Sequence, residues 1–298
     1  MSDQAIEIDG LVKRFHRTEA LRGLSLTVPR GSVCGFLGRN GAGKTTTIKI
    51  LMGMLRADAG AARVLGFDVE DPEASVAMRK RIGFVSENKE LYPYMTVAEM
   101  IHFVRGFFPG WRRDLEERYL KQFELPAERR LPKLSKGMNS KLQLLLALCR
   151  GAELLILDEA TEGLDPAVIE DALQAVVTLA AEAGTTVFFS SHQLAEVEQI
   201  ADRVCIIENG AAVLNESLDE LRARYRVVQV VFDGPAGEAA FEAPGIERMD
   251  ASGRVMSLLV SHGVDGVVEQ ARARQAVSVD VRPVSLKEIF LETVRAKA

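Results

Sequence analysis

The first 35 residues of the chain carry the apolar patterns of β-strands. The stretch AIEIDGLVKRF (5–15) has two short apolar runs around an Asp9-Gly10 pair, which indicates strands joined by a turn. LRGLSLTVPRG (21–31) alternates apolar and polar residues, and SVCGFLG (32–38) is a short apolar run, so each predicts a further strand. The spacing then becomes that of one helix face over residues 44–55, at Ile48, Leu51, Met52 and Leu55.

Helical spacing dominates from about residue 88 to residue 150. TVAEMIHFVRGFF (96–108) opens with Thr96 and, three residues on, Glu99, which is a capping-box pattern at the start of a helix. WRRDLEERYLKQFEL (111–125) and the strongly apolar NSKLQLLLALCR (139–150) predict two more helices. The helical spacing of the second stretch falls on Leu115, Tyr119 and Phe123. We expect residues 88–150 to form an inserted helical subdomain.

Strands and helices then alternate as far as residue 215. ELLILDEA (153–160) and TTVFFSS (185–191) predict buried strands, and QLAEVEQIA (193–201) predicts a short helix. Residues 165–184 predict a longer helix with Asp165 as its cap, Pro166 in its first turn and Gly184 as its terminator. An Asn209-Gly210 pair predicts a hairpin. This order predicts an α/β fold with a mixed, mainly parallel core sheet, preceded by N-terminal antiparallel strands.

The character of the chain changes after about residue 220. SLDELRARYR (217–226) reads as a charged helix or linker, and three strands and two helices are predicted beyond it. We therefore expect a main domain over residues 1–220 and a small α+β C-terminal domain over residues 221–298. Two roles are open for the smaller domain, a regulatory or dimer-contacting role and a purely stabilising one.

Composition excludes several classes of protein. Charged residues make up 27% of the chain and the net charge is −5, so no overall basic field points to a nucleic-acid partner. The sequence has no apolar run of about 20 residues, so we expect no membrane span. Acidic residues near the N-terminus argue against a signal peptide. Cys34, Cys149 and Cys205 lie in apolar runs, which predicts buried free thiols in a reducing cytosol.

The stretch GRNGAGKTT (38–46) carries the first candidate chemistry. It fits the phosphate-loop pattern G-x-x-x-x-G-K-[ST] and lies between a predicted strand and a predicted helix. Its glycines let successive backbone N–H groups converge on an anion, and the start of the helix adds its positive end. Lys44 is placed to reach β- and γ-phosphates, and the Thr45 hydroxyl is a hard oxygen ligand for Mg²⁺. The alternative is a glycine-rich turn with an incidental lysine.

Two acids at a strand end complete a triphosphate site. LLILDE (154–159) is a buried strand that finishes with Asp158 and Glu159. Asp158 is the expected partner of Mg²⁺, and Glu159 is then placed to polarise the attacking water. A pair of surface acids at a strand end is the alternative.

The order of these motifs resembles the nucleotide-binding subunit of ATP-binding cassette (ABC) transporters, over residues 5–215. LSKGM (134–138) precedes an apolar helix, EGLDP (162–166) follows Glu159, and His192 follows the strand TTVFFSS. VSLKEIFLETV (284–294) looks like the tail of exporter-type members. The resemblance implies a P-loop NTPase fold and an ATPase that uses ATP and Mg²⁺.

The resemblance also implies roles for individual residues. Phe15 matches the aromatic that stacks on adenine, where this family usually has tyrosine. Ser135 and Gly137 match the residues that contact the γ-phosphate of ATP held by the opposite subunit. His192 matches the residue that bonds the γ-phosphate and orients water, and Asp165 the acid that couples the two sites. The phosphate loop would be formed by Gly38, Asn40, Gly41, Gly43, Lys44, Thr45 and Thr46.

Two positions depart from the family pattern. Glu87 stands where many relatives carry glutamine, and its carboxylate is a further candidate ligand for Mg²⁺ or water. Ala160 stands where proline usually follows the catalytic glutamate, which loosens the loop before Asp165 without removing a chemical group. We therefore expect a hydrolytically competent site with Glu159, His192 and Lys44 as its catalytic groups.

The resemblance implies a transport system assembled from several subunits. Two copies, expected as a homodimer, would clamp ATP between them, and integral membrane permease subunits would be driven by that closure. The exposed aromatics Tyr92 and Tyr94 are candidates for seating a partner helix, with local packing as the alternative. The chain would then lie in the cytoplasm, peripheral on the inner face of the cell membrane.

Two other functions compete with export. A soluble ABC ATPase of DNA repair or translation would carry a long coiled-coil insertion or a second cassette, and the sequence has neither. A small-molecule P-loop kinase would lack LSKGM and His192. We expect the ATP-hydrolysing subunit of an ABC exporter.

Overall fold

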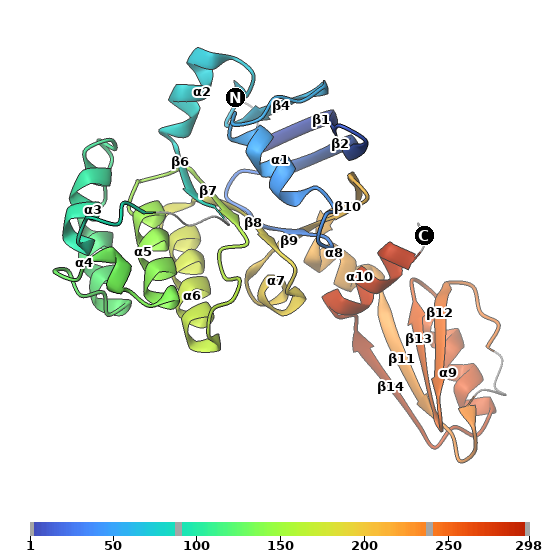
Figure 1. Cartoon of the computed structure of the whole chain (residues 1–298). Helices are drawn as coiled ribbons and strands as arrows, with labels where there is room; N and C mark the ends of the chain where they lie inside the picture. Colours follow the sequence, from blue (N-terminus) through green and yellow to red (C-terminus); the bar gives the residue numbers. More distant parts are fainter. Residues whose placement is uncertain (1–2, 87–90, 237–240, 296–298) are drawn as a thin grey trace. The chain divides into compact units, whose positions relative to one another are not determined.

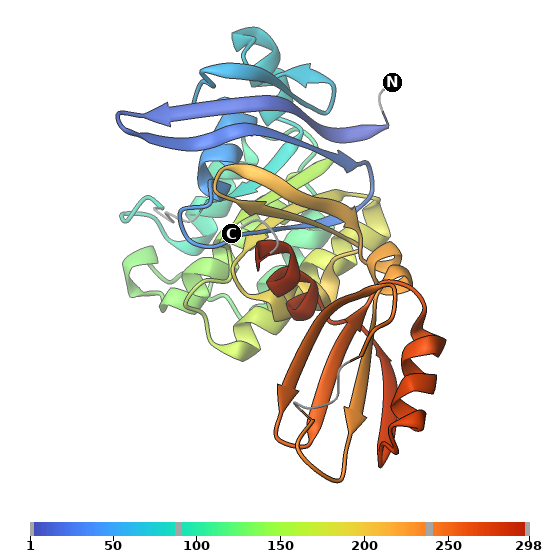
Figure 2. The same cartoon turned by 90° about the vertical axis from the view of Figure 1, so that its right-hand side faces the viewer.

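The computed structural model describes residues 3–86, 91–236 and 241–295. The chain divides into two compact units, Met1–Asn215 and Glu216–Ala298. Figures 1 and 2 show the elements of each unit from two directions.

An antiparallel sheet is built from the N-terminal part of the first unit. Its strand order is β2-β1-β4-β5. The Asp9-Gly10 turn was predicted wrongly, because β1 runs through it as one strand with a register shift between Ile8 and Leu11. Gly10 has a φ of 60° and donates its N–H to Ser25 Oγ, so it forms a bulge. The strands are β1 (Gln4–Phe15), β2 (Thr18–Pro29), β4 (Ala59–Val64) and β5 (Phe67–Asp68).

The core sheet carries the mixed, mainly parallel arrangement that the sequence predicts. Its order is β10-β9-β3-β8-β7-β6, and the neighbours from β9 to β6 are parallel. Asn209 and Gly210 have φ values of 50° and 80°, as the predicted hairpin between β9 and β10 requires. The strands are β3 (Val33–Leu37), β6 (Ile82–Val85), β7 (Leu154–Asp158), β8 (Thr186–Ser191), β9 (Arg203–Glu208) and β10 (Ala211–Ser217).

Helix α1 (Lys44–Leu51) lies between the two sheets, where it contacts β2, β4 and β7 (Figure 1). One apolar cluster joins the inner faces of both sheets to α1, with the rings of Phe36 and Phe188 5.0 Å apart inside it. The helix is shorter than predicted: it ends at Leu51, and Leu55 lies beyond its end. This core anchors the loop that precedes α1.

Helices follow one another in the region where the helical subdomain was expected (Figure 1). The capping box of α3 is confirmed, since Thr96 Oγ1 accepts the N–H of Glu99 and the Glu99 carboxylate accepts that of Thr96. Tyr119 stacks on Phe123 at 5.3 Å, and both are buried. The elements are α3 (Val97–Arg105), α4 (Arg113–Gln122), the 3₁₀ turn η1 (Leu131–Lys133) and α5 (Lys136–Leu148).

Three further helices complete the first unit. Helix α6 (Pro166–Ala183) ends at Gly184 with a φ of 62°, as predicted. Asp165 occupies its cap position, but within the described chain its side chain makes no capping hydrogen bond, so the expected cap chemistry was wrong. Helix α7 (Leu194–Ile200) was predicted, and α2 (Pro72–Arg79), capped by Asp71, was not.

All three cysteines are buried and free, as predicted. Burial raises the pKa of the Cys34 thiol to about 12 and lifts the pKa of Cys205 well above its usual value. Among the described residues, no helix combines the length and the apolar character needed to cross a membrane.

The second unit is a four-stranded antiparallel sheet with helices (Figure 2). The strand order is β12-β13-β11-β14, and α9 covers one face through Val267 and Ala271, which pack against Val228, Val230 and Leu258. Strand β12 was not predicted. The elements are α8 (Leu218–Arg224), β11 (Arg226–Val231), β12 (Ile246–Ser252), β13 (Val255–Val260), α9 (Val264–Ala273), β14 (Ser278–Pro283) and α10 (Leu286–Arg295).

Candidate functional site

The loop between β3 and α1 needs its glycines for packing and for backbone conformation. A Cβ on Gly38 would lie 2.6 Å from the Ile207 carbonyl oxygen. Gly43 has a φ of 112°, and a Cβ there would lie 2.8 Å from the Ala20 carbonyl oxygen. Gly41 has a φ of 83° but faces open space. The loop is therefore pressed against neighbouring backbone at its two ends, while a ligand can approach its backbone closely at Gly41.

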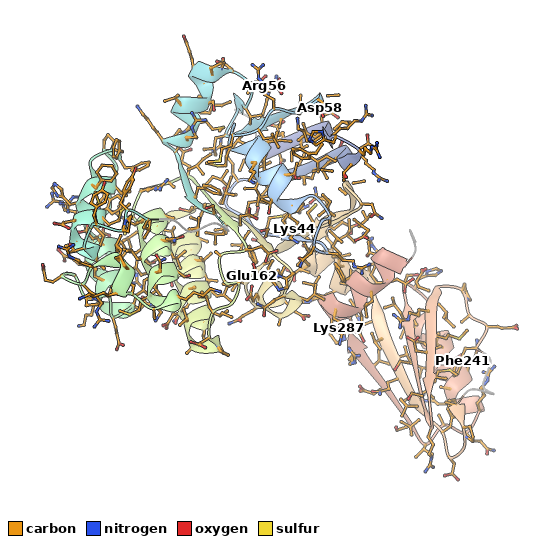
Figure 3. The ribbon with its side chains drawn as sticks, in the orientation of Figure 1. Lys44, Arg56, Asp58, Glu162, Phe241 and Lys287 are labelled. Carbon is orange, nitrogen blue, oxygen red and sulfur yellow. The ribbon has the colours of Figure 1, made fainter. Side chains whose placement is uncertain are left out.

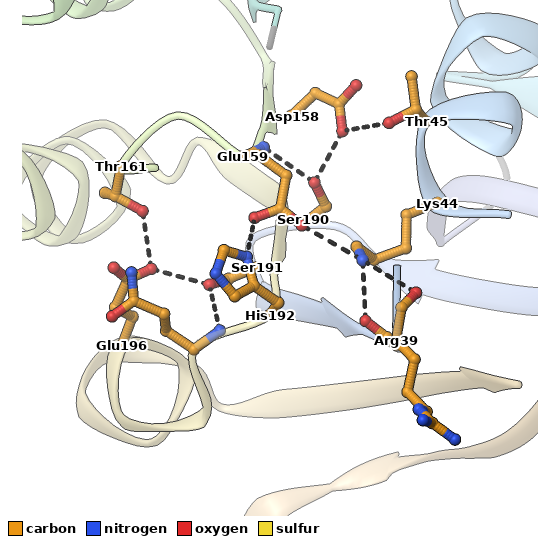
Figure 4. Close-up of polar contacts among 12 residues, drawn as sticks. Arg39, Lys44, Thr45, Asp158, Glu159, Thr161, Ser190, Ser191, His192 and Glu196 are labelled. Atoms are coloured by element: carbon orange, nitrogen blue, oxygen red, sulfur yellow. Dashed lines mark hydrogen bonds and ion pairs between the residues drawn. The ribbon is translucent and has the colours of Figure 1, made fainter. Parts of the chain in front are cut away.

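Lys44 is the first residue of α1, and its side chain turns back over this loop (Figure 4). Its Nζ donates to the Gly38 carbonyl oxygen at 2.8 Å and lies 3.2 Å from Glu159 Oε1. The Lys44 and Glu159 side chains are only 6% and 9% exposed, so this ion pair is buried. Lys44 Nζ also donates to the Arg39 carbonyl oxygen at 3.4 Å. Three oxygen atoms therefore hold the ammonium at the edge of the sheet.

Thr45 and Asp158 meet across the gap between α1 and β7. Thr45 Oγ1 lies 3.3 Å from Asp158 Oδ1. Ser190, which sits opposite Asp158 on the neighbouring strand β8, donates to the same Oδ1 at 2.8 Å and accepts the N–H of Glu159 at 3.0 Å. The sequence analysis did not find Ser190, because its signal depends on β7 and β8 being neighbours in space.

Glu159 and His192 form the second half of the site. His192 Nδ1 lies 2.9 Å from Glu159 Oε2, while the other carboxylate oxygen faces Lys44. Glu159 has a φ of 47°, a left-handed conformation that is unfavourable for a residue with a side chain. Such strain persists only where the surroundings fix the residue, and it concentrates at functional sites.

Lys44, Thr45, Glu159 and His192 line one cavity of about 370 Å³. Two of its wall residues were absent from the predicted set, Ala20 and Glu162. Figure 3 labels Glu162 and Lys44 among the side chains of the first unit. Eight of the predicted residues line the cavity. The complete lining is Ala20, Asn40, Gly41, Gly43, Lys44, Thr45, Thr46, Glu159, Glu162 and His192.

Other predicted residues are not part of the described cavity wall. Phe15 lies at the end of β1, is 43% exposed, and carries the Lys13 ammonium 5.6 Å from its ring centre. Ser135 caps α5, with its Oγ accepting the N–H of Met138, and Gly137 lies in the first turn of that helix. Glu87, the third expected metal ligand, falls outside the described residues.

The chain is similar to known proteins along nearly its whole length. The family model described as "ABC transporter" matches residues 21–162. The daunorubicin resistance ATP-binding protein DrrA3 of Streptomyces coeruleorubidus is 33% identical over 99% of this chain and 95% of its own. The Nod factor export ATP-binding protein I of Rhizobium sp. (strain N33) is 32% identical over 98% and 97%. ABC transporter ATP-binding protein YtrB of Bacillus subtilis is 27% identical over 96% and 97%.

Solved structures agree with this likeness. The ATP-binding subunit of an ABC transporter superposes with a TM-score of 0.66 at 28% identity, covering 74% of this chain and 92% of that one. A dimeric ATP-binding cassette in a post-hydrolysis state bound to ADP and Pi shares the fold, with a TM-score of 0.64 at 21% identity over 71% and 98%. The chain belongs to the family of ABC transporter ATP-binding proteins, which are ATPases with a P-loop NTPase fold.

Proposed function

We propose that this chain binds ATP and Mg²⁺, hydrolyses ATP within a dimer, and thereby drives export through membrane partners. The observation that carries the proposal is the convergence of Lys44, Thr45, Glu159 and His192 on one cavity at the phosphate loop.

The phosphates would be held by the loop and by the start of α1. Backbone N–H groups of the loop would supply neutral donors, apart from that of Ala42, which donates to the Arg39 carbonyl oxygen. The helix would add its positive end. Lys44 lines the cavity, and its Nζ pairs there with Glu159. The exposed ring of Phe15 would stack on the adenine, since stacking requires only a π face.

The oxygen atoms of Thr45 and Asp158 would hold the metal ion. A hydroxyl and a carboxylate supply oxygen ligands, which Mg²⁺ prefers. The two oxygen atoms lie 3.3 Å apart, so both could bind the same ion. Ser190 fixes the Asp158 carboxylate by donating to Oδ1. When bound, Mg²⁺ would neutralise charge on the phosphate oxygens. Glu87 remains a proposed further ligand.

Glu159 is the proposed general base. Its carboxylate would accept a proton from the water whose oxygen bonds to the γ-phosphorus, while the bond from that phosphorus to the ADP oxygen breaks. His192 holds Oε2 of this carboxylate at 2.9 Å and would orient the water and the γ-phosphate. The left-handed backbone of Glu159 turns the carboxylate into the cavity.

The dimer would complete each site. Ser135, which is exposed, and Gly137, which is half-buried, lie at the start of α5 and do not line the cavity. They would contact the ATP of a second subunit. One chain carries both halves, which favours a homodimer. Asp165 would couple the two sites of that dimer. Relatives named for daunorubicin resistance and Nod factor export support the direction of transport.

Four aromatic side chains are proposed to seat an apolar helix of a permease on the cytoplasmic side of the membrane. Tyr92 contacts Tyr94 at 5.8 Å and Phe103 at 5.5 Å, and Phe103 contacts Phe107 at 5.1 Å. All four remain between 38% and 64% exposed although they touch one another. Local packing therefore leaves much of their apolar surface open to a partner. Phe103 and Phe107 extend the predicted pair.

The test compares wild-type chain with Glu159→Gln. The variant should bind ATP and release no phosphate above background, while the wild type releases ADP and phosphate in equal amounts. Glu182→Gln is the matched control, because Glu182 is a surface acid, 58% exposed, that pairs with Arg118. Wild-type turnover in Glu159→Gln would refute the assigned role, and transfer of the phosphate to an acceptor other than water would favour the kinase.

A further inference from the structure

A buried carboxylate lies directly behind the proposed site. Glu196, in the first turn of α7, is 5% exposed. Its Oε2 accepts a hydrogen bond from Thr161 Oγ1 at 2.8 Å and another from Ser191 Oγ at 2.9 Å (Figure 4). Oε1 is buried without a hydrogen-bond partner among the described residues.

The two donors belong to the two segments that carry the proposed catalytic groups. Thr161 follows Glu159 by two residues, and Ser191 immediately precedes His192. Ser191 Oγ also accepts the N–H of Gln193, so the backbone on both sides of His192 is tied to this hydroxyl. Glu196 therefore joins the loop after β7 to the loop after β8.

The hydrogen bond between His192 and Glu159 needs the support of neighbouring buried groups. The His192 side chain is 40% exposed, so its hydrogen bond with Glu159 faces competition from water. Thr161, Ser191 and Glu196 are all less than 9% exposed, which shields their hydrogen bonds. Hydroxyl bonds to a carboxylate are stronger than neutral ones, and this network holds a strained Glu159 in place.

A stabilising role alone does not explain the arrangement. A buried carboxylate with one oxygen unbonded is costly, and an apolar residue would fill this space at less cost. We propose that Glu196 is a positioning residue for the hydrolysis step, which aligns Glu159 with His192 by tying Thr161 to Ser191. The inference rests on the proposed ATPase function and concerns the rate of hydrolysis, not nucleotide binding.

The first experiment compares Glu196→Leu with Glu196→Gln. Leucine removes both hydrogen bonds, and kcat should fall about 10-fold while the Kd for ATP changes less than about twofold. Glutamine keeps an oxygen that can accept both hydroxyls, so it should restore kcat to within about threefold of wild type. Equal losses in both variants, or a loss that appears only in the Kd, would overturn the proposal. Glu182→Gln is again the control, because it removes a surface carboxylate and should leave kcat unchanged.

A double-mutant cycle with His192→Ala separates positioning from general stability. If Glu196 acts through the alignment of Glu159 with His192, Glu196→Leu should lower the single-turnover rate less than about threefold in the His192→Ala background. The same 10-fold loss in both backgrounds would show a structural role instead. Should Glu196→Leu fail to fold, Thr161→Val removes one donor in a similar shape, and Thr161→Ser should restore the rate.

Failure of the proposed function would be recognised separately. Wild-type chain that hydrolyses ATP, with Glu159→Gln inactive, establishes the site before any Glu196 variant is measured. Normal hydrolysis in Glu196→Leu would then refute this inference alone.

Discussion

The Lys44–Glu159 ion pair makes a prediction about ATP affinity. Lys44 Nζ lies 3.2 Å from Glu159 Oε1 inside the cavity, and the bound phosphates would need the same ammonium. Glu159→Gln removes the competing charge and keeps the shape of the side chain. We expect the variant to bind ATP more tightly than wild type, although it does not hydrolyse it.

The geometry gives the size of the effect. With an effective dielectric constant of about 20, moving the ammonium from 3.2 Å to about 5 Å from the carboxylate oxygen loses roughly 2 kcal/mol of Coulomb attraction. In Glu159→Gln, ATP binding no longer costs most of this attraction. The repulsion between the carboxylate and the phosphates is also absent. Since about 1.4 kcal/mol corresponds to a tenfold change, the Kd for ATP should fall about 10- to 30-fold.

A titration of ATP in the presence of EDTA measures this difference, because hydrolysis is then suppressed in both proteins. The comparison is repeated in the Lys44→Ala background, where the competition for the ammonium no longer exists. Glu159→Gln should improve affinity much less in that background. Equal or weaker binding by Glu159→Gln alone, or the same gain in both backgrounds, would refute the reasoning.

Three further predictions concern the loop, the cavity wall and the second unit. Gly43→Ala places a Cβ 2.8 Å from a backbone oxygen and should abolish ATP binding in a titration, whereas Gly41→Ala meets open space and should cost only the left-handed strain of about 1–2 kcal/mol in unfolding free energy. Glu162→Gln removes an acid from the cavity wall and should tighten ATP binding about threefold at low salt, with a smaller gain at high salt; no change at any salt concentration would contradict it. Burial alone would raise the pKa of Glu288, but hydrogen bonds from Arg282 and Ser285 lower it to about 2. Its contribution to stability is therefore full above about pH 4.5 and lost as pH falls toward 2, so the difference in unfolding free energy between wild type and Glu288→Gln should vanish over that range in denaturant titrations.

Sequence reasoning succeeded where a local pattern fixes the structure. The elements around the phosphate loop, α6 with its Gly184 end, and the Asn209-Gly210 hairpin depend on apolar runs and turn residues that are adjacent in the chain. Sequence reasoning failed where a strand forms only because it pairs with a distant strand. Strand β4 is rich in alanine and glycine, which have low strand propensity, and exists because it pairs with β1.

The same distinction applies to the site. Lys44, Asp158 and Glu159 lie in short motifs, so their types and spacing could be read directly. Ser190 and Glu196 act through contacts between segments about 30 residues apart or more, and ordinary strand and helix sequences surround them. Gly10 shows the converse case, since a turn signal becomes a bulge when both flanking runs pair with the same two strands.

The central claim is that Lys44 and the phosphate loop grip a triphosphate that a second copy then seals. The most direct measurement is the molar mass of Glu159→Gln by light scattering, with and without ATP and Mg²⁺. The mass should rise from that of one 32.6 kDa chain to that of two only when ATP is present, and the additional change Lys44→Ala should abolish the rise. A molar mass that does not change when ATP is added would contradict the account. So would an equal rise in the variant that also carries Lys44→Ala.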